Sequence, residues 1–297
     1  MSYKGKKIAT KVGFDLCGIT PCRHFEKNEQ AYRHWLEKGY SSSLEYMTRN
    51  MDKRFNPADL VEDAKCVIVC GVSYKSEISG GYSPEDRAKI ASYACNRDYH
   101  KSIKKMLLSM LKELQAIYPR LQGRAFVDSA PLLEKQLAVE AGLGWIGKQS
   151  LLITPEYGSY VLLGELVINM EADEYDKPLE VTGCAECKRC VEACPTGAIV
   201  EPMVINTAKC ISCQTIETEA SEKPDLNGWV FGCDECQNCC PYNKKAKAHT
   251  SSHFDPLFDP RKISVAEWRS MSEEEFSARF GSTPLKRARL ERIKQNL

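Results

Sequence analysis

Two runs of cysteine constrain the fold of this chain more than any other feature of its sequence. The first run is Cys184-x-x-Cys187-x-x-Cys190-x-x-x-Cys194-Pro195. The second run is Cys233-x-x-Cys236-x-x-x-Cys240-Pro241, and Cys210 lies between the two. The first spacing is typical of two neighbouring [4Fe–4S] clusters, because three of its thiolates bind one cluster and the fourth crosses to the other. The sequence therefore predicts a segment that transfers single electrons over short distances.

Each [4Fe–4S] cluster is held by four thiolates, and the spacing assigns eight of the fifteen cysteines to this role. The first cluster is assigned Cys184, Cys187, Cys190 and Cys240, and the second Cys194, Cys210, Cys233 and Cys236. A proline follows each crossing cysteine and turns the chain away from the cluster. Cys213 and Cys239 lie outside the pattern and are expected to be packing residues. Cys239 competes with Cys240 for the ligand position, although only Cys240 precedes a proline.

Two other uses of cysteine fit this chain less well. A zinc ribbon pairs two C-x-x-C knuckles and is complete with four ligands. A disulfide framework is typical of small secreted domains, whereas this chain has 297 residues and no signal peptide.

Composition and charge bound the remaining possibilities. The chain is 43% hydrophobic, enough for one large core or two smaller ones. No run approaches the roughly 18–20 apolar residues of a membrane span, so we expect a soluble, cytoplasmic protein. The net charge of +1 excludes the global basic field that marks many nucleic-acid-binding proteins. Basic side chains do gather in two segments, 244–247 and 285–297, where a solvated helix face is the simplest interpretation.

The residues before the cysteines predict a mixed α and β region. Strands are expected at 14–20, 66–74, 124–128, 149–153 and 160–169, and helices at 98–118 and 131–141. Segment 66–74 is nearly all apolar, as a strand buried on both faces would be. An acidic linker is expected at 171–182. After the cysteines, the patterns Ser264–Glu267 and Ser272–Glu275 predict capping boxes that begin short helices.

One segment of this region, 127–134 followed by a glycine-rich stretch at 142–153, allows two interpretations. In the first, Asp128 or Ser129 caps the helix that begins near Pro131, and the glycines form turns. In the second, Asp128 points into a pocket whose glycines let the backbone approach a large cofactor closely. The sequence contains no G-x-G-x-x-G motif and no phosphate-binding loop.

These stretches together resemble the epoxyqueuosine reductases, cobalamin-dependent enzymes of the last step of queuosine synthesis in tRNA. The resemblance covers most of residues 8–245 and is carried by segments 13–19, 44–47, 54–57, 93–100, 127–134, 142–153, 210–217 and 231–236, besides the cysteine runs. It implies an α+β fold, with an α/β cobalamin-binding core related to the reductive dehalogenases and a ferredoxin-like domain with two [4Fe–4S] clusters. The corresponding domains are residues 1–172, residues 173–250 and a basic, helical segment at 251–297.

The resemblance also implies roles for individual residues. Asp128 matches the proton donor of the family. Lys148, Gln149, Ser150 and Ile153 match the segment that wraps the corrin. Arg54 and Cys95 fall where the family has residues near the cofactor or substrate. The five histidines are scattered, and we expect them to be surface or core residues, because the family binds cobalamin without a histidine ligand from the protein.

The reaction of the family removes the oxygen of an epoxide as water and leaves an alkene, which takes two electrons and two protons. The clusters supply electrons singly to cobalamin, and Asp128 is expected to protonate the departing oxygen, a contribution of roughly 10²–10⁴-fold. To act near neutral pH, Asp128 would need burial to raise its pKa above the free value of about 3.9.

The resemblance makes a tRNA anticodon stem-loop the expected partner, with an unknown electron donor and a monomeric protein. The basic segments then position phosphates, and such contacts fix orientation and not sequence. Longer members of the family continue beyond the cluster domain into helical repeats, whereas this chain stops at Leu297, and Cys213 stands where the family more often has an aromatic residue. The alternative functions are a corrinoid-dependent reductase of another substrate, similar to a dehalogenase, and a non-catalytic iron–sulfur electron carrier.

Overall fold

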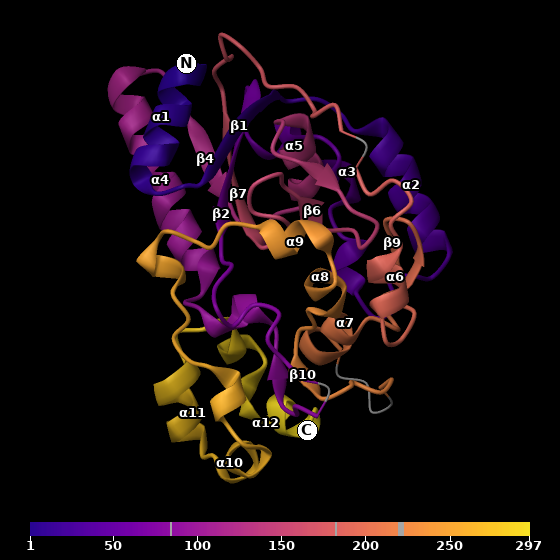
Figure 1. Cartoon of the computed structure of the whole chain (residues 1–297). Coiled ribbons are helices and arrows are strands. Elements are labelled where there is room, and N and C mark those ends of the chain that lie inside the picture. Colours follow the sequence, from indigo (N-terminus) through magenta and orange to yellow (C-terminus); the bar gives the residue numbers. More distant parts are fainter. Residues whose placement is uncertain (84, 182, 219–222) are drawn as a thin grey trace.

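A four-stranded antiparallel sheet organises the first part of the chain (Figure 1). The structure, a computed structural model, describes residues 1–83, 85–181, 183–218 and 223–297. The strand order is β1-β2-β7-β4, in which β1 is Leu16–Pro21, β2 Cys66–Ser73, β7 Val161–Ile168 and β4 Gly123–Phe126. Every residue of β2 is buried, as its apolar sequence predicted, because β2 is central in the sheet and covered on both faces.

Helices cover both faces of this sheet. Helices α1 (Ser2–Val12) and α4 (Tyr99–Ile117) pack on one face, where Ile103, Leu107 and Met110 of α4 meet Ile68 of β2. Helix α5 (Glu134–Glu140) packs on the other face against Val67, Val69 and Val167. The result is a three-layer α/β/α arrangement, with side chains alternating between the two faces along each strand.

The predicted strands and helices of this region are confirmed, and two of them differ most in extent. Segment 149–153 forms only the short strand β6 (Leu152–Ile153), which pairs with β5 (Trp145–Ile146), because Ser150 has φ 66° and cannot continue a strand. The helix predicted from Pro131 begins at Glu134. Its N-cap is Leu133, without a side-chain hydrogen bond, so the interpretation of Asp128 or Ser129 as a helix cap is wrong.

The cysteine-rich segment consists of short elements. These are α6 (Arg189–Ala193), β8 (Ile199–Glu201), β9 (Val204–Ile205), α7 (Ile211–Ile216), β10 (Trp229–Phe231), α8 (Glu235–Asn238) and α9 (Pro241–Lys245). Strand β10 runs parallel to β3 (Lys89–Ile90), which joins this segment to the first part of the chain. The linker predicted at 171–182 has no helix or strand in its described residues, and Thr182 lies outside them.

The C-terminal helices build a second core. Helices α10 (Val265–Ser270), α11 (Glu273–Phe280) and α12 (Arg289–Gln295) pack around β3 and β10, as Figure 1 shows below the sheet. Ser272 and Glu275 form the predicted capping box. Ser264 accepts a hydrogen bond from Glu267 N, but the Glu267 carboxylate instead contacts Arg279 at 2.6 Å, so the predicted reciprocal box is only half formed.

The other elements connect these cores. They are α2 (Glu26–Glu37), α3 (Met51–Arg54) and the 3₁₀ helices η1 (Glu45–Met47), η2 (Pro57–Leu60), η3 (Ser92–Cys95), η4 (Ser252–Phe254), η5 (Pro260–Lys262) and η6 (Pro284–Arg287). Among the described residues, no helix combines the length and the apolar character that crossing a membrane requires.

Candidate active site

Asp128 follows β4 directly and has a left-handed backbone conformation. Its φ is 56°, a region that costs energy for a residue with a side chain and that is common at functional sites. The backbone N–H of Asp128 donates to Glu134 Oε1 at 2.5 Å. The turn from β4 toward α5 is therefore held by the first residue of that helix, and it directs Asp128 away from the strand.

Two groups from the start of α4 donate to the Asp128 carboxylate. Tyr99 Oη donates to Oδ2 at 2.9 Å, and His100 Nε2 lies 3.1 Å from the same oxygen. The two rings stack on each other at a centroid distance of 4.1 Å. The Asp128 side chain is nevertheless 48% exposed, so a substrate can reach it.

These contacts lower the pKa of Asp128 and correct the expectation that burial would raise it. The hydrogen bond with His100 is the main cause of the lowered pKa, and it outweighs the opposing effect of desolvation. The same contact raises the pKa of His100, with Asp98 as a further hydrogen-bonding partner. The stable arrangement is thus an Asp128 carboxylate beside a protonated imidazole.

A buried pair of acids lies beneath Asp128. Glu165 is central in β7 and fully buried, on the face of the sheet that α5 covers. Burial raises its pKa well above the ordinary value, and burial together with the charge of Asp128 raises the pKa of Glu134 to about 7. Neither oxygen of Glu165 accepts a hydrogen bond from another described residue. A buried carboxyl without a cation is expected to be neutral, so we expect Glu165 to hold a proton.

Further polar groups surround the accessible face of Asp128. Burial and the acid Glu217 raise the pKa of Tyr46 to about 12, and Asp128 contributes to this effect. Burial, and then Asp128, also raises the pKa of Tyr93, while Arg287 of η6 acts in the opposite direction. Asp128 is thus accessible although the protein around it partly desolvates it.

The predicted corrin-wrapping residues lie on the β5–β6 hairpin. Lys148 Nζ donates to Ala185 O at 2.7 Å, Ser150 Oγ donates to Met203 O at 3.2 Å, and Ile153 is fully buried. Lys135 of α5 donates to Ser150 O at 2.6 Å. This hairpin is therefore fixed between α5 and the cysteine-rich segment.

The hairpin has the features expected of a site for a large polar cofactor. The buried donors Gln149 Nε2 and Trp145 Nε1 have no hydrogen-bonding partner among the described residues, and native proteins rarely leave such groups unpaired. An added Cβ at Gly147 would lie 2.3 Å from Gln149 Oε1, so a larger residue there would displace the Gln149 side chain. The residues present thus fit a bound group that accepts hydrogen bonds and approaches the backbone closely.

Arg54 and Cys95, the two further candidates for contact with the cofactor or substrate, lie in different parts of the structure. Arg54 Nη2 donates to Tyr46 O at 3.2 Å, and Arg54 Nε is buried without a partner among the described residues. Cys95 lies in the C-terminal core, where its thiol donates to Ala91 O at 3.8 Å. No described contact joins Cys95 to Asp128, and its role near the cofactor stays a prediction.

Pairs of cysteines from the two runs lie near one another, and these neighbours fall into two groups. In the first group, Cys184 and Cys187 each act electrostatically on Cys190 and on Cys240. In the second group, Cys194 acts on Cys210, which in turn acts on Cys233 and Cys236. These neighbours belong to the two sets that the spacing assigned, but the described residues contain no group of three or more side chains placed to hold a metal ion, so the ligand assignment stays a prediction. Cys239 lies near Cys190 and Cys240, and Cys213 lies near Cys210, so both extra thiols border a group.

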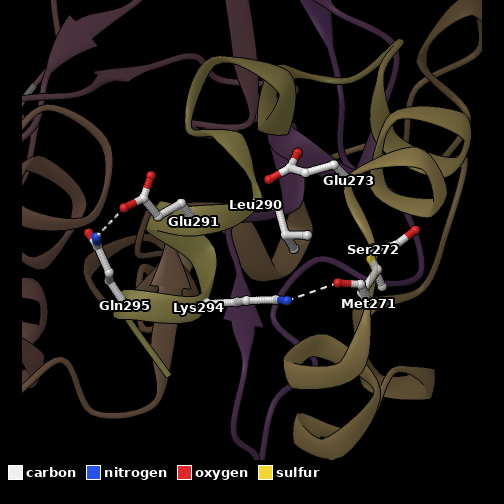
Figure 2. Close-up of a pocket in the computed structure, with 7 residues that line it drawn as sticks. All are labelled: Met271, Ser272, Glu273, Leu290, Glu291, Lys294 and Gln295. Atoms are coloured by element: carbon white, nitrogen blue, oxygen red, sulfur yellow. Dashed lines mark hydrogen bonds between the residues drawn. The ribbon is translucent and has the colours of Figure 1, made fainter.

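One surface cavity lies away from these residues. It has a volume of about 630 Å³ and lies between the α10–α11 connection and α12 (Figure 2). Lys294 points across it and donates to Met271 O at 2.8 Å, and Gln295 donates to Glu291 at 3.2 Å. No residue that the sequence analysis assigned to catalysis, cofactor binding or the clusters lines this cavity.

The sequence analysis missed Tyr99, His100, Glu134 and Glu165 as members of the site. Tyr99 and His100 lie in segment 93–100, one of the stretches that carry the resemblance, so their position was a usable signal. Glu165 offered a different signal, a single acid in an otherwise apolar strand, Val161–Ile168. A charge in a strand buried on both faces calls for a specific partner.

Comparison with known proteins defines the class first. Residues 183–243 match a family model described as a 4Fe-4S double cluster binding domain, and residues 54–129 match one described as Epoxyqueuosine reductase QueG, DUF1730. The chain is thus an iron–sulfur protein with a catalytic α+β domain.

The chain is 41% identical over 296 residues to the epoxyqueuosine reductase of Cyclobacterium marinum, covering 98% of this chain and 94% of that protein. It is 36% identical to the enzyme of Escherichia coli, covering 93% and 74%. The chain belongs to the epoxyqueuosine reductase family and is an oxidoreductase.

Solved structures agree with this assignment. A crystal structure of an epoxyqueuosine reductase with an epoxyqueuosine-modified tRNA-Tyr stem loop has a TM-score of 0.88 and 28% identity, covering 99% of this chain and 79% of that one. A Bacillus subtilis epoxyqueuosine reductase, with its aspartate catalytic loop swung out of the active site, has the same TM-score, identity and coverage. A catabolic reductive dehalogenase shares the fold at a TM-score of 0.50 and 16% identity, over 98% of this chain and 37% of that one. The predicted relation of the fold to the dehalogenases is confirmed.

Proposed function

We propose that this chain reduces epoxyqueuosine to queuosine in the anticodon loop of a tRNA, with two [4Fe–4S] clusters and cobalamin as cofactors. The observation that carries the proposal is Asp128. It is an accessible carboxylate in a left-handed turn, with two hydrogen-bond donors behind it. In the Bacillus subtilis relative, an aspartate loop is the catalytic loop and has a second position outside the active site. A strained turn after β4 is consistent with such a loop.

The cofactor-binding residues follow from the two thiol groups and the hairpin. Cys184, Cys187, Cys190 and Cys240 hold one cluster, and Cys194, Cys210, Cys233 and Cys236 hold the other. Lys148, Gln149, Ser150 and Ile153 hold the corrin, with Arg54 and Cys95 as further candidates. The unpartnered donors Gln149 Nε2 and Trp145 Nε1 support this assignment, since a corrin carries amide groups that accept hydrogen bonds.

The protein residues divide the chemistry between them. When bound, cobalamin supplies a strongly reducing cobalt centre for cleavage of the carbon–oxygen bonds. The cysteine ligands hold the clusters that deliver two electrons, one at a time. Asp128 delivers protons to the departing oxygen, which leaves as water after both carbon–oxygen bonds are broken. Tyr99 and His100 orient the Asp128 carboxylate toward that oxygen.

Exposed basic residues support a tRNA partner. Lys244, Lys245, Lys286 and Arg287 are exposed, and their side chains make no hydrogen bond or ion pair with another described residue. Lys247 and Lys294 are instead occupied, by Glu156 at 2.7 Å and by Met271 O at 2.8 Å. Arg287 lies close enough to Asp128 to lower its pKa, so the guanidinium can position a phosphate at the entrance of the site.

Substitution of Asp128 tests the role of this carboxylate. Asp128→Asn keeps a side chain that can accept from Tyr99 but removes the acid, so we expect turnover to fall by roughly 10²–10⁴-fold. Cobalamin binding and the iron–sulfur absorbance are expected to be unchanged. Asp52→Asn, at an exposed position in α3, is the matched control. Full turnover of Asp128→Asn with both cofactors bound would remove the proton-donor role.

A corrinoid-dependent reductase of another substrate is the second candidate. The likeness to the dehalogenase supports it at the level of the fold alone. Separate incubations of the reduced protein with the tRNA stem-loop and with a halogenated phenol distinguish the two candidate functions. We expect turnover of the tRNA only.

A further inference from the structure

We infer that His100 stores the proton that Asp128 delivers and reloads Asp128 between the two protonation steps of the reaction. The inference rests on the proposed function, because the need for two protons comes from that reaction. Its structural basis is a chain of three side chains, Asp98, His100 and Asp128. His100 Nδ1 lies 2.7 Å from Asp98 Oδ1, and His100 Nε2 lies 3.1 Å from Asp128 Oδ2.

This geometry fixes where a proton must be. A neutral imidazole carries a single N–H and can donate to only one of two carboxylates. Both ring nitrogens of His100 face carboxylate oxygens, so a further proton must lie on the line between Nε2 and Asp128. Asp98 is itself held in place, because its carboxylate also accepts from His100 N at the start of α4. The Asp128–His100 pair therefore carries one transferable proton, which resides on the ring at rest.

The stoichiometry of the reaction requires a second proton, which the proton on His100 can supply. Epoxide plus two electrons plus two protons gives an alkene plus water, and both protons end on the same oxygen. One acid therefore acts twice, first as the ring opens and again as the hydroxyl leaves. Asp128 is the accessible carboxylate at this point, and after the first transfer it needs a new proton. The imidazole in contact with it supplies that proton and is itself reloaded from solvent, to which its side chain is 22% exposed.

Other neighbours are less suitable as the store. Tyr99 also donates to Asp128, but burial and the charge of Asp128 raise its pKa, which makes the phenol a weaker acid. Glu134 contacts the backbone N–H of Asp128 and not its carboxylate. Arg287 is a permanent cation and cannot release a proton near neutral pH. His100 is thus the donor with both the contact and an ordinary pKa in the working range.

The pH dependence follows from the groups around His100. Asp98 and Asp128 face its two nitrogens, and Tyr99 stacks on the ring. Glu134 and Arg287 act on Asp128. The carboxylates raise the pKa of His100 and dominate this set. Turnover needs the protonated ring, so the rate is expected to fall as the pH rises through the raised pKa of His100. Asp98→Asn removes one carboxylate and is expected to move this fall to lower pH.

The test combines kinetics with a titration that does not depend on turnover. His100→Gln can still donate to Asp128, so binding of cobalamin and the stem-loop should persist while the rate falls by roughly 10²-fold. Added imidazole should restore part of the rate, and the alkaline fall should disappear. Histidine NMR of the protein with oxidised clusters and no cobalamin should give a lower His100 pKa in Asp128→Asn and Asp98→Asn. His34→Gln, whose side chain is 68% exposed, is the control.

The outcomes separate this inference from the proposed function. Slow turnover of His100→Gln, rescued by imidazole, together with the shifted titration supports the proton store. A wild-type rate in His100→Gln overturns it, as does a loss without rescue and with an unchanged pH profile. Absence of any product with the wild-type protein overturns the proposed function and the inference together.

Discussion

The surroundings of Asp128 and Glu165 shift the pKa values of these two carboxyl groups in opposite directions. Asp128 receives hydrogen bonds from His100 and Tyr99, which lower its pKa. Glu165 receives none from the described residues and is fully buried, so its pKa is raised. The same type of group is thus ionised at the surface of the site and neutral beneath it.

The neutral state of Glu165 predicts how stability depends on pH. Its folded-state pKa lies above the ordinary value of 4.5, so the folded protein keeps a proton that the unfolded chain releases. Stability then falls as the pH rises from about 4.5 toward the raised pKa, by up to about 1.4 kcal/mol per pH unit for one proton. We expect Glu165→Gln to flatten this fall, so that the variant gains stability relative to the wild type between pH 5 and pH 8.

Urea unfolding at several pH values measures this effect. Glu37→Gln is the control, because the Glu37 side chain is 75% exposed and should leave the pH dependence unchanged. A Glu165→Gln variant whose stability follows the wild-type curve in parallel would mean that Glu165 is already ionised in the folded state.

Spacing along the chain predicts which residues act together when they are close in the sequence. It does not predict contacts between residues that are far apart in the sequence and meet only in the fold. Spacing predicted which thiols of each cysteine run lie close together, because they are only a few residues apart, and the assignment of the cluster ligands stays a prediction. The surroundings of Asp128 could not, since His100 comes from α4 and Glu165 from β7. For this reason the pKa of Asp128 was expected in the wrong direction, and His100 was expected to have no role in the site.

The elements that position the site depend on close packing between β1 and α5. Gly18 of β1 has no room for a side chain, because an added Cβ would lie 2.0 Å from Ala141 O at the end of α5. This contact sets the position of α5 and with it that of Glu134, which holds the Asp128 turn. Apolar patterning predicted β2 and α4 well. It did not predict where α5 begins, because the strained turn at Asp128 is fixed by tertiary contacts.

Substitution of Gly18 tests this packing. We expect Gly18→Ala to destabilise the protein by at least about 1–3 kcal/mol, the usual cost of overpacking. Gly5→Ala in α1 is the matched control, since its nearest neighbour would lie 3.7 Å from the new Cβ and alanine favours a helix by roughly 0.5–1 kcal/mol over glycine. The thermal unfolding midpoints of the two variants should therefore move in opposite directions. Equal midpoints would contradict the role of this contact.

Two features connect distant parts of the chain: the contact of Cys240 with thiols of the first cysteine run, and the second core. Cys240 returns from the second run to the thiols of the first, next to the alternative ligand Cys239. The core around β3 and β10 contains residues of the first, middle and last parts of the chain. The sequence predicted the order of segments, and the division into three domains stays a prediction.

Iron analysis of two serine variants decides between the adjacent cysteines. We expect Cys240→Ser to lose about half of the bound iron, because it removes a ligand of one of the two clusters. Cys239→Ser should keep its iron. The reverse pattern would make Cys239 the ligand and Cys240 a packing residue.

Turnover of an epoxyqueuosine-containing tRNA stem-loop tests the central claim most directly. The assay is anaerobic, with reconstituted clusters, added cobalamin and a strong reductant, and nucleoside mass spectrometry measures the product. We expect the nucleoside to lose one oxygen only when cobalamin is present. An unchanged nucleoside, with both clusters intact and cobalamin bound, would contradict the proposed reaction.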